Sequence, residues 1–276
     1  ATVRTDKSRQ LLAGVLANDS FYGVRTEAAK SLGKLKGDIA RDALLAGLSQ
    51  INAKVRRACA TALGNFEHDS NVQDALRRKN SEGDISYFVE SSVLASFSKV
   101  LDEPPVDLLI AALEKPSHRE TIRLTALQQL GKSSEPEVQA VLFDWTKPGK
   151  PPLCRPEACR QLVEFANRNL FPEAATDRIV KHLLDLLDTS GPRMRGSIAS
   201  ALGSLGNRAN SARTRLQELT KAEPNDWTRT SIKAAIDRIS TPASDTAALK
   251  KLQKEIDEAR TQTRSLEERL YRLETP

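Results

Sequence analysis

The sequence predicts an all-α protein, an α-solenoid of about seven helical hairpins followed by a C-terminal coiled-coil helix. A ten-residue pattern recurs along the chain at intervals of 31 to 36 residues, and its apolar positions have helical spacing. Aromatic residues make up only 4% of the chain. Stacked helices can be filled with Leu, Ala, Ile and Val, whereas a sheet core normally uses more large β-forming residues.

The repeat is clearest in residues 24–33 and 55–64, which read VRTEAAKSLG and VRRACATALG. In each copy the apolar residues fall at i, i+4, i+5 and i+8, which is one face of an α-helix. The small residue at the end suits either close approach to a neighbouring helix or a left-handed helix cap. The further copies begin at Val89, Ile122, Ala158, Met194 and Thr228.

A second apolar segment precedes most copies, as in residues 43–48 and 108–113, and a short polar turn separates the two. Such a hairpin cannot bury its apolar face alone, so stacking predicts one continuous solenoid over residues 1–240. Residues 147–152, KPGKPP, interrupt the helical pattern. We expect a loop there that changes the curvature, with a ligand-gating loop as the alternative.

An acidic residue before some copies identifies the kind of repeat. These residues are Asp19 before Val24-Arg25, Asp84 before Val89, and Asp226 before Arg229. The arrangement resembles the Asp…Val-Arg core of HEAT repeats, and the signature motifs of tetratricopeptide and ankyrin repeats are missing. The spacing is shorter than the roughly 40–47 residues usual for HEAT repeats. It is similar to the compact HEAT-like repeats of phycobilin lyases, so we expect HEAT-like hairpins.

The tail over residues 245–274 follows a heptad pattern after a short linker. Large aliphatic residues at the a and d positions predict a coiled-coil helix that packs against another helix. The partner is either the same helix of a second copy, which would make a homodimer, or another protein, or the chain's own solenoid with the tail folded back as a cap. The predicted interface consists of Leu249, Leu252, Ile256, Leu266, Leu270 and Leu273.

Residues for catalysis or for metal and cofactor binding do not form a recognisable motif. His68, His118 and His182 are far apart in the sequence, and no phosphate-binding or nucleophile motif occurs. Cys59 falls on the apolar side of its helix, and Cys154 and Cys159 have a poor spacing for zinc or redox chemistry. We therefore expect no enzyme activity, cofactor or metal for this chain. No apolar run is long enough to span a membrane, and a reducing, cytoplasmic location is the default expectation.

The formal net charge is +6, and the tail from Asp245 onward is balanced, with seven basic and seven acidic residues. The excess therefore lies in the solenoid, where second helices of HEAT hairpins usually line the concave face. Nucleic acid would require a contiguous basic stripe, preferably with stacking aromatic residues. Alternatively, the arginines hydrogen-bond the neighbouring repeat. The candidate concave-face binding residues are Arg25, Arg56, Arg57, Arg123, Arg195 and Arg229.

Three segments, residues 18–29, 83–90 and 266–270, resemble the HEAT-like C-terminal region of bacterial aminopeptidase N-like zinc peptidases. The resemblance implies an accessory domain that covers an active site or binds a partner. The zinc-binding motif of that family is absent here, so no catalytic residue is implied. Because the chain starts at Ala1 and its only methionine is Met194, we expect a piece of a longer protein.

The leading hypothesis is therefore a non-catalytic protein-interaction or accessory scaffold. Its partner is another protein or its own missing catalytic domain. The alternative is a basic solenoid that binds nucleic acid on its concave face, and a weaker third option is an enzyme that acts on a bilin or another small ligand.

Overall fold

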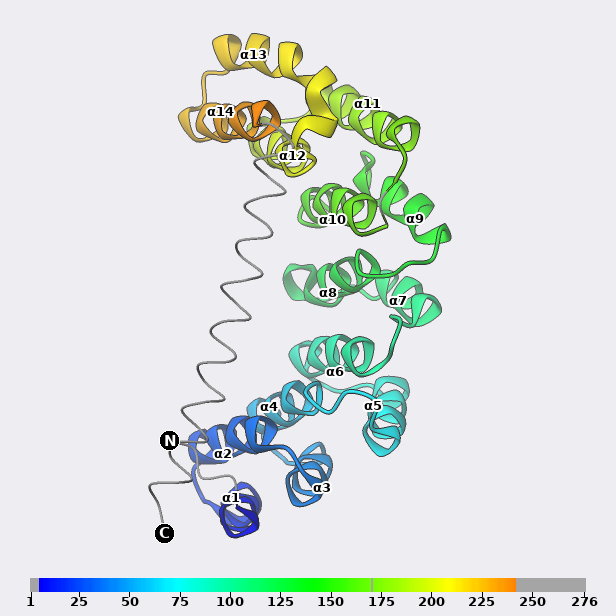
Figure 1. Ribbon diagram of the computed structural model, residues 1–276. Helices are drawn as coiled ribbons and strands as arrows, with labels where there is room; N and C mark the ends of the chain where they lie inside the picture. Colours follow the sequence, from blue (N-terminus) through cyan, green and yellow to red (C-terminus); the bar gives the residue numbers. More distant parts are fainter. Residues whose placement is uncertain (1–4, 170, 242–276) are drawn as a thin grey trace, which may run out of the picture. The chain divides into compact units, whose positions relative to one another are not determined.

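The computed structural model describes residues 5–169 and 171–241, which are helical apart from turns and loops (Figure 1). They divide into two compact units, with the boundary between residues 171 and 172. The α-helices of unit 1 are α1 (Asp6–Asn18), α2 (Tyr22–Leu35), α3 (Asp38–Gly47), α4 (Ala53–Leu63), α5 (Ser70–Glu82), α6 (Tyr87–Val100), α7 (Val106–Leu113), α8 (Thr121–Leu130), α9 (Glu137–Thr146) and α10 (Cys154–Arg168). Those of unit 2 are α11 (Glu173–Thr189), α12 (Pro192–Ser204), α13 (Arg213–Ala222) and α14 (Asp226–Ser240).

These helices form seven consecutive hairpins in the described part of the chain, which confirms the predicted fold class. Five hairpins, from α1/α2 to α9/α10, make up unit 1, and α11/α12 and α13/α14 make up unit 2. The 3₁₀ segment η1 (His118–Glu120) lies between α7 and α8 within one hairpin, and η2 (Gly206–Ala212) connects the hairpin α11/α12 to α13/α14. In unit 2, α12 packs closely against α14, and η2 contacts both α11 and α14.

The second helices of unit 1 form one continuous row. Each of α2, α4, α6, α8 and α10 contacts the next in the row, and Figure 1 shows α3, α5, α7 and α9 in a second row beside them. Along that second row, α3 and α5 touch only sparsely. The row with the closer spacing lies on the inner, concave side of a stack of hairpins.

The repeated apolar residues make the core, as the helix α4 illustrates. Asn52 caps its start by accepting a hydrogen bond from the backbone N–H of Lys54, and Val55, Cys59 and Leu63 are fully buried at intervals of four residues. Burial of each large aliphatic side chain contributes about 1.5–3 kcal/mol. The apolar stripe, repeated in every hairpin, is therefore the main source of stability.

The small residue at the end of each copy allows neighbouring second helices to approach closely. A Cβ atom on Gly33 would lie 2.7 Å from the Cβ of Ala62, and one on Gly203 would lie 2.9 Å from the Cα of Ala235. Gly64, at the C-cap of α4, has a φ of −60°, which any residue adopts. Close packing is therefore the reason for these glycines, and a left-handed cap is not.

Two copies of the repeat depart from the expected burial. Val24, in the first copy, is 42% exposed, because no described helix precedes the first hairpin to cover it. In the last copy Ile236 is only half-buried, while Ala235 and Ile239 are buried beside Ile232. Within the described residues, α14 packs mainly against α12, α13 and η2, and its buried face differs from the repeat pattern.

The proline-rich segment forms the predicted loop between α9 and α10. Within it Gly149 has a φ of +95°, a conformation that suits glycine. Lys150 pairs with Asp144 at 2.7 Å and lies 4.8 Å from the ring centroid of Trp145, so this loop is tied to α9. Its predicted effects on curvature and on ligand access stay predictions.

The predicted coiled-coil helix and its six interface residues lie outside the described residues. The coiled coil, the homodimer and the domain limits of 1–240 and 245–274 therefore stay predictions. Among the described helices, none has both the length and the apolar character needed to cross a membrane.

Candidate functional site

The predicted arginines lie in the first turn of second helices, and Arg56 shows how most of them are used. Its Nε and Nη2 atoms donate to the two carboxylate oxygens of Asp84 at 2.8 and 2.7 Å, and Nη1 donates to the carbonyls of Gln50 and Ile51. Burial alone would raise the pKa of Asp84, but hydrogen bonds from Arg56, the Ser86 backbone and Lys79 lower it to about 2. This pair joins the second hairpin to the third.

Unit 2 contains the same arrangement 28 residues apart, between Arg195 and Glu223. The Arg195 Nε atom donates to Glu223 at 2.7 Å, and Nη1 donates to the Ser190 carbonyl. Burial opposes ionisation of Glu223, but hydrogen bonds from the Asn225 backbone and Arg195 lower its pKa. Glu223, and not the expected Asp226, therefore occupies the position that Asp84 has in unit 1.

Three further arginines are also bound within the fold. Arg25 donates to the Gln50 side chain at 2.7 Å, and Arg123 donates to the Leu113 carbonyl at 2.7 Å and to Glu120. Arg229 donates to the Glu223 and Pro224 carbonyls. Arg25, Arg56 and Arg195 thus bond the next hairpin, as the alternative expected, whereas Arg123 and Arg229 bond within their own hairpin. A binding role for all five stays a prediction.

Arg57 is the exception, because it is exposed and faces a groove. Its guanidinium lies over the ring of Phe88, 4.9 Å from the centroid. The groove crosses the second helices α2, α4, α6 and α8 of unit 1 and has a volume of about 810 Å³. We call it the basic groove. Its cationic lining residues are Lys30, Lys34, Lys54, Arg57, Lys99 and Lys132.

The lining of the basic groove includes these six cations and no carboxylate. Acidic neighbours stand outside the lining: Glu27 pairs with Lys30 at 2.6 Å, and Glu67 lies 3.9 Å from Lys99. Lys34 makes no ion pair with any of the described residues. The groove therefore carries a net positive charge that the fold does not neutralise.

Lys132 shows how closely the cations are placed. Burial lowers its pKa first, and repulsion by Arg168 and Lys99 lowers it further. Its Nζ atom donates to Gln129 at 3.0 Å, a neutral partner that leaves the charge uncompensated. A bound anion would relieve this repulsion, so the electrostatics favour an anionic ligand.

Three of the lysines occupy one repeat position, which the sequence reasoning missed. Lys34, Lys99 and Lys132 each directly follow the small residue that ends a copy, and Arg168 holds this position in the fifth copy. The signal was present in the sequence as Gly-Lys, Ser-Lys and Gly-Lys. This signal lies at the opposite end of the helices from the arginine that follows the valine.

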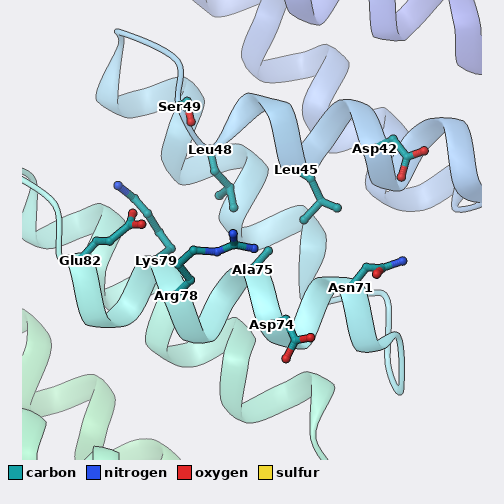
Figure 2. A pocket seen from close by; sticks show the side chains of 10 residues that line it. All are labelled: Asp42, Leu45, Leu48, Ser49, Asn71, Asp74, Ala75, Arg78, Lys79 and Glu82. Atoms are coloured by element: carbon teal, nitrogen blue, oxygen red, sulfur yellow. The ribbon is translucent and has the colours of Figure 1, made fainter.

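A second cavity lies between the first helices α3 and α5 (Figure 2), with a volume of about 550 Å³. Figure 2 shows Leu45 and Leu48 pointing from α3 toward α5. Its charged lining residues are of both signs, namely Asp42, Asp74, Arg78, Lys79 and Glu82. This mixed lining gives the cavity no preference for ligands of one charge.

The structure places no reactive constellation among the described residues. The three cysteines are buried and free, and burial raises the pKa of Cys59 to about 12. A thiol with such a pKa is a poor nucleophile or metal ligand at neutral pH. No three His, Cys, Asp or Glu side chains of the described part gather as they would around a metal ion.

Comparison with known proteins agrees with the repeat geometry. Residues 24–50, which cover most of α2 and all of α3, match the family model of the PBS lyase HEAT-like repeat. The described helices thus form a HEAT-like solenoid, and one of its repeats matches this family model. No curated protein matches it by sequence.

Several solved structures are distantly similar to this chain. Human deoxyhypusine hydroxylase in complex with glycerol is 21% identical, with 84% of this chain and 87% of that chain covered and a TM-score of 0.38. The complex of CpcE and CpcF of phycocyanin lyase from Nostoc sp. PCC7120 is 17% identical, with 84% and 94% covered and a TM-score of 0.49. An engineered protein is 19% identical, with 85% and 69% covered and a TM-score of 0.44. Such distant likenesses transfer no ligand or partner.

Proposed function

We propose that this chain is a non-catalytic scaffold that binds an anionic partner in the basic groove of unit 1. The observation that supports the proposal is a lining of six cations without a carboxylate. Uncompensated charges of one sign repel one another, and a surface of one sign steers partners of the opposite sign to it. Binding of an anionic partner would therefore reduce the repulsion between the cations of the groove.

The residues of the groove favour binding over bond-breaking chemistry. General acid–base catalysis uses a group that titrates near the working pH, most often a histidine or a carboxylate. The lining contains neither, and it contains no cysteine. Its remaining residues are alanines, threonines, a serine and amides, which contact a ligand without changing it.

The narrower proposal is that the chain is the accessory C-terminal domain of an aminopeptidase N-like protein. It rests on the sequence resemblance alone, and the relatives reported above do not include a peptidase. An aminopeptidase assay of this chain with added zinc tests the non-catalytic part. We expect no turnover above the metal-only control, and turnover would contradict the proposal.

Nucleic acid is the second candidate partner, and two contacts at the groove favour it. Lys54 lies 4.9 Å from the ring centroid of Tyr22, and Arg57 lies at the same distance from Phe88. Basic residues interleaved with aromatic rings are typical of single-strand binding surfaces. Binding through phosphates would weaken steeply as salt rises, because it releases counterions.

A charge-reversal variant tests whether the basic groove binds anions, which both candidate partners require. Replacing Lys34, Lys99 and Lys132 with Glu should abolish retention of the protein on poly-glutamate and single-stranded DNA columns at low salt. The control carries Lys7→Glu, Lys115→Glu and Lys233→Glu, three exposed lysines outside the groove, so its net charge is the same. Equal loss in both variants, or no retention of the unmodified protein on either column, would defeat the proposal.

A further inference from the structure

The floor of the basic groove contains polar groups that the fold leaves without a partner. Gln129 and Ser96 are each only 6% exposed and line the groove. Gln129 accepts a hydrogen bond from Lys132, but among the described residues nothing accepts one from its amide nitrogen. The Ser96 hydroxyl likewise has no hydrogen-bond partner in the described part of the chain. Both polar ends open onto the groove, so a ligand there could supply the missing partners.

The length of the groove sets the size of the ligand. The groove crosses four neighbouring helices, α2, α4, α6 and α8. Packed helices lie about 8–10 Å apart, so the three steps span about 27 Å. An extended polypeptide advances about 3.3 Å per residue and would cross this distance in about eight residues.

The rest of the floor suits a polypeptide better than a nucleic acid. Ala58, Ala62 and Ala95 provide small apolar contacts, and no aromatic ring belongs to the lining, so bases would have no stacking platform inside the groove. Five of the six cations are lysines. Arginine is the better match to phosphate because it binds two oxygens at once. A lysine, which presents a single charged group, is suited to pairing with one carboxylate at a time.

We infer that the basic groove holds an extended acidic protein segment of about eight residues. Its carboxylates pair with the groove lysines, its small apolar side chains lie on the alanines, and its backbone carbonyls accept hydrogen bonds from Gln129 and Ser96. This inference rests on the proposed anionic binding and names the class of partner.

Fluorescence anisotropy with defined probes tests the partner class. The probes are an eight-residue peptide of alternating Glu and Ala, the same peptide with Lys in place of Glu, and single-stranded and duplex DNA. We expect the full chain to bind the acidic peptide. The Lys34→Glu, Lys99→Glu, Lys132→Glu variant should bind this peptide at least about tenfold more weakly. The surface-lysine control should bind as the unmodified protein does.

A second variant separates peptide binding from charge attraction alone. Gln129→Leu keeps the approximate size of the side chain and every cation of the groove. It should lower the affinity for the acidic peptide about fivefold and leave DNA binding unchanged. Thermal melting checks that the variant folds. A peptide affinity unchanged in folded Gln129→Leu would overturn the proposed backbone contact.

The remaining outcomes distinguish this inference from the function on which it rests. If DNA binds in a groove-dependent way and the acidic peptide does not, the inference falls and the anionic-binding function stands. If neither probe binds, both fall.

Discussion

In unit 1, arginines lie near the start of α2, α4 and α8, and lysines lie at or just after the end of α2, α6 and α8. The two sets of cations have opposite surroundings. At the beginning of the helices, Arg56 is held by Asp84 and by two backbone carbonyls. At the other end of these helices, Lys34, Lys99 and Lys132 face a groove whose lining contains no acidic residue. We call these the arginine row and the lysine row.

The difference arises from what each end of a helix meets. A cation near a helix N-terminus is disfavoured by the helix dipole, and therefore needs nearby carbonyls or carboxylates. The loops between paired helices supply both, as at Gln50 and Asp84. A cation at a C-terminus is favoured by the dipole without a partner, so its charge stays available. The number of basic residues in a repeat thus says less about binding than their position in it.

The arginine row should determine stability, and Arg56→Ala tests this with the largest expected effect. Removing one partner of a buried pair costs about 3–5 kcal/mol, because the other charge stays buried. Lys79 lies 3.2 Å from Asp84 and compensates in part, so we expect about 3 kcal/mol. Urea denaturation measures the loss, with the exposed neighbour Arg57→Ala as control. Equal effects of the two changes would contradict the comparison.

The lysine row depends on close helix packing, which Gly33→Ala would disturb. The added methyl would lie 2.7 Å from the Ala62 Cβ and 3.1 Å from its Cα, so the backbone must move at a cost of about 1–3 kcal/mol. At Gly14, in α1, an added Cβ meets nothing within 4 Å. We expect Gly14→Ala to be neutral or slightly stabilising. Thermal melting of both variants distinguishes packing from helix propensity.

Acid should weaken the arginine row specifically. The pKa of Asp84 falls from 3.8 to about 2 in the folded protein. The carboxylate therefore adds stability above pH 4, and this stability is lost as the pH falls toward 2. One pKa unit corresponds to about 1.4 kcal/mol, so the loss is roughly 2 kcal/mol. In Asp84→Asn the free energy of unfolding should therefore depend less on pH between 4 and 2. Asp74→Asn, at an exposed site, should leave this pH dependence unchanged.

The lysine row should matter little for stability, which gives the smallest expected effect. Lys34→Ala and Lys99→Ala should change the free energy of unfolding by no more than about 0.5 kcal/mol, because surface changes away from buried contacts rarely do more. Urea denaturation of each variant provides the measurement. A loss as large as that of Arg56→Ala would show that these lysines serve the fold.

The helices, their pairing into seven hairpins and most of the core could be predicted from the amino-acid sequence. Local spacing is enough for this, because an apolar stripe such as Val55, Cys59 and Leu63 allows only one helical face to be buried. It also indicated that Cys59 is buried and that the first-turn arginines had a structural alternative. It failed at Ile236, because α14 buries Ala235 and Ile239 beside Ile232 in the described part of the chain.

Which cations are held by carboxylates and which face the groove depends on how the hairpins stack. Arg56 and Lys99 have the same formal charge and lie on neighbouring second helices, and their places at opposite ends of these helices do not by themselves show which one a buried carboxylate holds. Asp84 reaches Arg56 from 28 residues away in the chain, and the groove around Lys99 is built from four helices. Charge compensation depends on distances between residues far apart in sequence, and only the stacking of the hairpins sets those distances.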